Sequence, residues 1–218
     1  MTLTRRQALL ATGTTLTALL SGCGATQQEF TFSATPGRIT QQGLSDAGYN
    51  LDQQEEIIQQ RTVEAAGQER DVTVTNHLRT YTRSISQRGV SRELIAAVFT
   101  SPSISIVGQQ FNPLADLELS GLLERTQGRF SDYGAPQLQE LTRRGEFSIQ
   151  SLSTEATVGV FSAVTAGTPA IDIEVLISRF EHNVDYIILR GGYPQSVTET
   201  ERQRVRTLFE NIAHNSSE

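Results

Sequence analysis

The sequence has no lysine and no tryptophan, and its 218 residues include one cysteine, Cys23. Without lysine there can be no P-loop, whose lysine reaches the nucleotide phosphates. Because Cys23 stands near the N-terminus, the domain after it can form no internal disulfide and must be stabilised by packing. No GxSxG or HExxH motif is present either. A nucleophile elbow and a helical zinc site are therefore not expected.

Only three histidines occur, His77, His182 and His214, and they are far apart in the sequence. A zinc site takes about three or four converging ligands, so we expect no histidine-based metal site and no cofactor. We expect His182 to lie in a turn. We expect His214 to lie in the last turn of a C-terminal helix, where a cation suits the helix dipole.

Arginine supplies all 18 basic side chains, against 24 acidic ones, for a net charge of −6. An acidic surface without lysine stays hydrated when salt is high and screening lengths have fallen to a few ångströms. This composition is typical of haloarchaeal proteins. It also argues against a nucleic-acid partner, which requires a basic face.

The N-terminal segment is predicted to be an export signal. Arg5 and Arg6 precede a weakly apolar stretch, residues 8–20, which is shorter than the roughly 20 residues of helix that cross a bilayer. The stretch instead fits the h-region of a signal peptide, and the paired arginines resemble a twin-arginine signal.

The same segment ends in a pattern that resembles a lipobox, in which two small residues precede the cysteine. We predict cleavage before Cys23 and attachment of membrane lipid to its thiol, on the outer face of the cell membrane. One chain binds a membrane only marginally, whereas a two-chain lipid anchors it firmly. The lipobox residues are Leu20, Ser21, Gly22 and Cys23.

The chain is predicted to contain one folded domain. Residues 1–22 form the signal peptide, 23–29 the lipidated cysteine and a short polar tether, 30–214 the domain and 215–218 a tail. Removing the signal changes the net charge from −6 to −8, because Arg5 and Arg6 are its only charged side chains. The remaining length is enough for one sizeable core.

Alternating apolar residues predict mainly strands. One long hairpin is expected from residues 55–65 and 69–85 around Gly67, and a second from 156–166 and 170–180 around Gly167. A third tight turn, at residues 181–183, leads into another strand, 184–192. Further strands are predicted at residues 94–100, 103–110 and 137–151.

Two helices are expected beside these strands. One begins after Asp116, carries an apolar stripe from Leu119 and stops at Gly128. The C-terminal helix is predicted to start at a capping box, either Ser196 with Glu199 or Thr198 with Glu201. Its apolar stripe is Val205, Leu208, Phe209 and Ile212. The predicted fold class is α+β: an antiparallel sheet, with a long hairpin and a C-terminal meander, on which both helices pack.

Several sequence segments resemble those of a known family: "AGQERDVTVTNHLRTY", "VGQQFNPLADL", "GYPQSVTETERQRVRTLFENI" and the lipobox. Over nearly the whole mature chain they resemble a family of haloarchaeal, twin-arginine-exported lipoproteins of unknown function. More loosely, the order of elements is similar to the PsbP-like fold, whose members mostly bind partners. The resemblance implies no catalytic residues.

One candidate site lies on the long hairpin. His77, Arg79, Tyr81 and Arg83 alternate with period two, so they line one strand face and could grip a carboxylate, a phosphate or a sulfated sugar. The alternative, which we favour, is ordinary cross-strand pairing with Glu56 or Glu64.

Two further candidates are acidic or polar. Asp172 and Glu174 share a strand face and could bind calcium or act as an acid/base pair, but a solvated acidic face is the simpler interpretation. Asn215 opens a glycosylation sequon with Ser217.

These observations lead us to expect a membrane-anchored extracytoplasmic lipoprotein. Its domain would act by binding, as an accessory or assembly module for an unidentified envelope protein. The alternatives are a hydrolase that uses surface carboxylates or the His77 stripe, and a lipoprotein that binds a small solute. A deep pocket with several converging polar groups would favour an enzyme, and a shallow convex surface a partner-binding module.

Overall fold

The computed structural model describes residues 29–87, 89–132 and 134–215. The predicted signal residues Arg5 and Arg6 and the lipobox with Cys23 lie outside these ranges.

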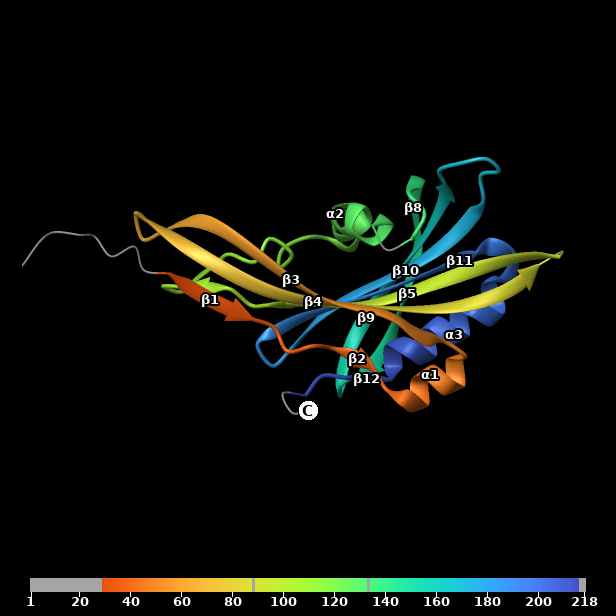
Figure 1. Ribbon diagram of the computed structural model, residues 1–218, viewed down its shortest axis with the longest axis horizontal. Helices are drawn as coiled ribbons and strands as arrows, with labels where there is room; N and C mark the ends of the chain where they lie inside the picture. The colour runs from red at the N-terminus through yellow and green to blue at the C-terminus, as the bar shows by residue number, and fades with distance from the viewer. Residues whose placement is uncertain (1–28, 88, 133, 216–218) are drawn as a thin grey trace, which may run out of the picture.

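An eight-stranded sheet forms the centre of the molecule (Figure 1). Its strands follow the order β1-β4-β5-β11-β10-β9-β8, and β3 pairs with β4. Neighbouring strands are antiparallel, except that β1 runs parallel to β4. The strands are β1 (Phe30–Ser33), β3 (Asn50–Ala65), β4 (Gln68–Gln87), β5 (Val90–Pro102), β8 (Leu138–Ser151), β9 (Thr154–Thr165), β10 (Asp172–His182) and β11 (Asp185–Pro194).

The predicted hairpins are confirmed. Ala66 and Gly67, with φ of 52° and 71°, form the turn between β3 and β4, as a two-residue hairpin with both φ values positive requires. β9 and β10 pair across the loop that contains Gly167. The third turn, between β10 and β11, lies at residues 183–184, where Asn183 adopts a φ of 57°.

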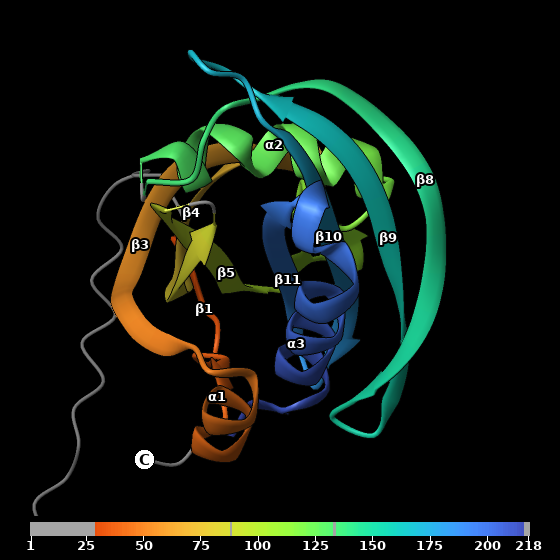
Figure 2. The same ribbon diagram turned by 90° about the vertical axis from the view of Figure 1, so that its right-hand side faces the viewer.

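Helices cover both faces of the sheet (Figures 1 and 2). One face carries α2 (Leu119–Ser131), and the other carries α1 (Gln41–Ala47) and α3 (Thr198–Glu210). Strand β11 shows how alternation divides the core between them. Ile188 packs in the cluster that contains α2, and Leu189 in the cluster that contains α3. The α+β fold predicted from the sequence is therefore confirmed.

Short elements differ from the prediction. Residues 103–110 form a small hairpin, β6 (Ser105–Ile106) and β7 (Gln109–Gln110), because Val107 and Gly108 turn the chain with φ of 52° and 77°. α1 was not predicted. It is one short helix, capped by the Thr40 hydroxyl, which accepts from Gly43 N, and closed by Gly48 at a φ of 70°.

The helix ends also differ. α2 continues past Gly128 because its apolar stripe extends to the buried Phe130. After the short helix η1 (Gln195–Val197), the N-cap residue of α3 is Val197, which makes no side-chain cap bond. Glu201 is buried and bound to Arg83 instead. Ile212 lies beyond the helix, in β12 (Ile212–Ala213), which pairs with β2 (Arg38–Ile39).

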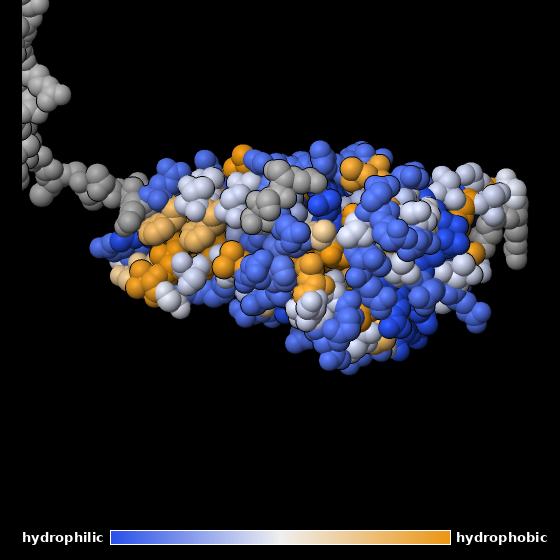
Figure 3. All heavy atoms as spheres, turned by 90° about the horizontal axis from the view of Figure 1, so that it is seen from below, coloured by the Kyte–Doolittle hydropathy of each residue, from blue (hydrophilic) through white to orange (hydrophobic). Residues whose placement is uncertain are grey.

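Apolar side chains gather on the surface at the end of the molecule where β1 begins (Figure 3). At this end the rings of Phe30 and Phe32 stack at 6.5 Å and pack with Val63 and Phe111. No helix in the described part of the chain has both the length and the apolar character needed to span a membrane.

Candidate functional site

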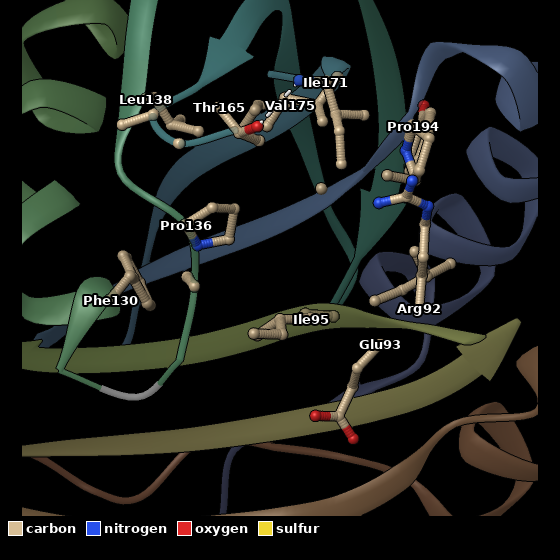
Figure 4. Close-up of a pocket in the computed structure, with 18 of the residues that line it drawn as sticks. Arg92, Glu93, Ile95, Phe130, Pro136, Leu138, Thr165, Ile171, Val175 and Pro194 are labelled. Atoms are coloured by element: carbon tan, nitrogen blue, oxygen red, sulfur yellow. Dashed lines mark hydrogen bonds between the residues drawn. The ribbon is translucent and has the colours of Figure 1, made fainter. Parts of the chain in front are cut away.

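A cavity of about 470 Å³ opens on the α2 face of the sheet, beyond the C-terminal end of that helix. Its size falls within the roughly 300–1,000 Å³ typical of small-molecule sites. β5, β10 and β11 form its floor, and the segments at residues 135–138 and 165–171 form its walls. Figure 4 shows Phe130 and Pro136 on one side of the cavity, Thr165 and Ile171 on another, and Ile95 on the strand beneath.

The cavity exists because of where α2 stops and which residues follow on the strands. α2 covers Ile177 and Ile188 and ends at Ser131, so the next residues of β10 and β11 are left without a helix above them. Ala97 and Gly192, which also line this region, are too small to fill it. Strands rather than loops therefore form its floor.

Arg190 is the one buried charged residue of the cavity lining, and it is 7 % exposed. It follows Ile188 by two positions on β11, so alternation directs it to the same α2 face. Its Cζ lies 4.5 Å from the centroid of the Phe130 ring. The other charged lining residues are Arg92, which is half-buried, and Glu93, which is exposed.

The guanidinium of Arg190 has no charge partner among the described residues: no carboxylate oxygen lies within 4.0 Å, and its buried Nη1 forms no hydrogen bond. Burial lowers the pKa of Arg190 to about 10, so the group still carries its charge at neutral pH. A buried charge is costly unless it is paired and hydrogen-bonded. This site therefore holds a positive charge and N–H donors that the chain itself leaves unused.

Arg190 was not predicted from the sequence, although a signal was present. Residues 186–189 are apolar without alternation, which is typical of a strand buried on both faces. A charged residue in the middle of such a strand has to be buried, and so requires an explanation. The prediction treated this segment only as a strand.

The hairpin stripe lies on one strand face, as predicted, but its members have different partners. The Tyr81 hydroxyl accepts from Ile39 N at 3.0 Å, and Arg83 Nη1 lies 2.5 Å from Glu201 Oε1. His77 and Arg79 line a separate surface hollow that also contains Glu55 and Glu56.

Among the described residues no ion pair joins the stripe to Glu56 or Glu64. Glu56 stands directly opposite His77, whereas Glu64 stands opposite Glu69 and reaches no member of the stripe. Tyr81 and Arg83 are bound to other groups inside the fold. The anion site suggested for the stripe therefore remains only a prediction.

The prediction of a solvated acidic face was wrong for Glu174. Asp172 is exposed, but Glu174 is 8 % exposed. Glu174 accepts hydrogen bonds from the Tyr193 hydroxyl at 2.5 Å and from Nε and Nη2 of Arg202 at 2.8 and 2.6 Å. Burial, followed by the bond to Glu174, raises the pKa of Tyr193 far above its usual value. Glu174 thus joins α3 to the sheet and is not a surface carboxylate.

The predicted positions of two histidines were also wrong. His214 lies past the end of α3 and is buried, and its Nδ1 is 2.8 Å from Nδ1 of His182. His214 Nε2 lies 3.0 Å from Thr35 O and 3.1 Å from Asp185 Oδ2, so this nitrogen must carry a proton. His182 is therefore not only a turn residue, because it contacts His214 in the segment that follows α3.

Asn215, the predicted glycosylation residue, is exposed, and the rest of its sequon lies outside the described residues.

Comparison with known proteins gives one finding. The model of a family described as a domain of unknown function (DUF6517) matches residues 36–213, which is most of the chain. A search of curated proteins gives no match.

Proposed function

The chain belongs to the DUF6517 family of domains of unknown function, and we propose that it is a lipid-anchored, extracytoplasmic protein that binds a small, largely apolar ligand. The cavity on the α2 face carries this proposal. It has the size of a ligand site, its floor is formed by strands, and most of its lining is apolar.

The cavity favours binding over catalysis. An acid/base or nucleophilic site requires several polar groups placed within hydrogen-bond reach of one another. Here Arg190 is the only buried ionisable side chain of the lining other than Tyr193, whose hydroxyl is bound to Glu174. The Thr165 hydroxyl accepts from Ile171 N, so it serves the loop.

The anchor is proposed from the sequence. Arg5, Arg6 and the lipobox that ends in Cys23 form the expected signal, and six residues, 24–29, separate Cys23 from the start of β1 at Phe30. At about 3.3 Å per residue this tether reaches roughly 20 Å, so the domain would work close to the lipid surface. The lysine-free, acidic composition supports a haloarchaeal envelope protein that functions in high salt.

The proposal is tested by filling the cavity. Ile95→Trp introduces a larger side chain from the cavity floor, and Val184→Trp introduces the same side chain at a turn position that is 72 % exposed and outside the cavity lining. Both variants are made in the full chain with Cys23→Ser, so that no attached lipid competes. The probe is N-phenyl-1-naphthylamine, an uncharged apolar dye, titrated in molar salt.

We expect saturable dye binding to the parent chain and to Val184→Trp, with binding weakened roughly tenfold or more in Ile95→Trp because the added ring occupies the site. Equal binding to Ile95→Trp and the parent, or no saturable binding to the parent, would overturn the proposal.

A further inference from the structure

We propose that the ligand of the cavity is an amphiphilic monoanion, a single carboxylate on an apolar body, and that its carboxylate pairs with Arg190. This inference rests on the proposed function, because it assumes that the cavity is a binding site. It adds the charge and the polarity of the ligand.

The guanidinium of Arg190 is unmatched. Arg190 is more than nine-tenths buried and lines the cavity, and among the described residues no carboxylate pairs with it. Its Nη1 is enclosed without a hydrogen-bond acceptor. Two other arginines pair with buried carboxylates, Arg83 with Glu201 and Arg202 with Glu174. Arg190 has no such partner among the described residues, and it lines the cavity.

The guanidinium of Arg190 also contacts Phe130. The ring lies 4.5 Å from the guanidinium carbon and stabilises the cation through its π face. A ring cannot accept the in-plane N–H bonds of the guanidinium edge as a carboxylate does. That edge matches a carboxylate with two parallel hydrogen bonds. Phe130 therefore covers one face of the Arg190 guanidinium and takes none of its in-plane N–H bonds.

The charge of the cavity lining limits the charge of its ligand. One buried guanidinium neutralises one negative charge, and the two other charged residues of the lining, the half-buried Arg92 and the exposed Glu93, carry opposite charges. A doubly charged phosphate would keep an unpaired charge in a poorly solvated site. Residues such as Ile95, Leu138, Ile171 and Val175 instead offer contact to an apolar body. A monocarboxylate with an apolar body would pair with Arg190 and also contact the apolar lining.

The test compares two probes that differ in the head group alone, decanoate and 1-decanol. Their affinities are measured by displacement of N-phenyl-1-naphthylamine from the full chain with Cys23→Ser, in molar sodium chloride. The high chloride concentration is deliberate. If an inorganic anion satisfied Arg190, chloride would occupy the site and remove any preference for decanoate. A buried ion pair is screened little by this salt.

Two variants remove the charge, Arg190→Met and Arg190→Gln, and the thermal midpoint of each is recorded. Methionine replaces an unpaired buried charge with an apolar side chain, so we expect this variant to remain folded with an unchanged or higher midpoint. Glutamine retains hydrogen-bonding ability if methionine does not fold. Arg92→Met is the matched control, because Arg92 is a less buried arginine of the same lining.

We expect the parent chain and Arg92→Met to bind decanoate roughly tenfold or more tightly than decanol. We expect the Arg190 variants to bind both probes alike, at about the parent's affinity for decanol. Equal affinity of the parent for the two probes, or a preference that survives in both Arg190 variants, would overturn this inference while binding of the dye leaves the proposed function standing. Failure of the parent to bind dye, decanoate and decanol would overturn both.

Discussion

At the scale of single residues, buried polar groups determine where a substitution most affects the stability of this fold. Glu174 and Arg190 both lie on the central strands, yet the first is fully matched and the second is not. A matched buried group contributes to stability, whereas an unmatched one costs free energy and so points to a function.

The matched group gives the first stability prediction. Glu174→Ala would leave the buried Tyr193 hydroxyl and the Arg202 guanidinium without their acceptor. We expect it to lower the free energy of unfolding by about 1–3 kcal/mol. The control is Glu146→Ala, because Glu146 is 56 % exposed and pairs with an exposed arginine, so it should change stability by less than about 1 kcal/mol. Denaturant unfolding in constant salt measures both, and equal losses would contradict the account.

Residue-level prediction from the sequence was the least successful. The stripe from His77 to Arg83 lies on one face because strand alternation is a local property. The partners of Tyr81 and Arg83 are Ile39 and Glu201, which come from distant segments that no local pattern identifies. The apolar residues 186–189 could have indicated that Arg190 is buried, whereas the absence of a partner for it is known only once the whole fold is assembled.

At the scale of secondary structure, close packing of α3 on β11 gives the second stability prediction. A Cβ at Gly191 would lie 2.5 Å from Val205 Cγ1, whereas a Cβ at Gly192 would meet its nearest atom, Glu174 O, at 3.8 Å. We expect Gly191→Ala to cost about 1–3 kcal/mol because the helix must move outward.

Gly192→Ala is the neighbouring control and should be close to neutral, because 3.8 Å is an ordinary contact distance. Thermal and denaturant unfolding of the two variants compares them directly. A loss at Gly192 as large as that at Gly191 would show that glycine is needed for the strand itself and not for helix packing.

Long elements were predicted well and short ones were not. The paired strands of the three hairpins carry enough alternating residues to define their period, and the turns between them contain glycine or asparagine at positive φ. α1 has seven residues, too few for a clear helical period. The β6–β7 hairpin has two-residue strands, so its eight-residue neighbourhood was predicted as one strand.

At the scale of the whole molecule, one polar cluster around the buried His214 and Asp185 joins segments that are far apart in the sequence. His214, after α3, contacts His182 at the end of β10, Asp185 at the start of β11 and Thr35 after β1. Thr35 N also donates to Asp185 Oδ2 at 2.8 Å. Stability should therefore respond to the protonation of His182.

Burial, and then the neighbouring His214, lowers the pKa of His182 below its ordinary 6.5, while Asp185 acts in the opposite sense. The unfolded chain therefore takes up this proton at a higher pH than the folded one. Between the two pKa values the unfolded state binds more protons, so the free energy of unfolding falls as the pH falls below 6.5.

We expect His182→Gln to flatten this dependence and His77→Gln, on the distant hairpin, to leave it unchanged. Thermal midpoints measured from pH 7.5 down to pH 5 provide the test. An unchanged slope in His182→Gln would show that His182 does not cause the acid sensitivity.

The central claim, that the domain binds a small molecule in the cavity on the α2 face, is tested most directly by native mass spectrometry. The full chain and its Ile95→Trp and Val184→Trp variants would be purified without added ligand from membranes of the cells that produce them. The account predicts that the parent and Val184→Trp carry a small bound molecule that is released as a monocarboxylic acid, and that Ile95→Trp does not. The same adduct on all three chains, or none on the parent, would contradict it.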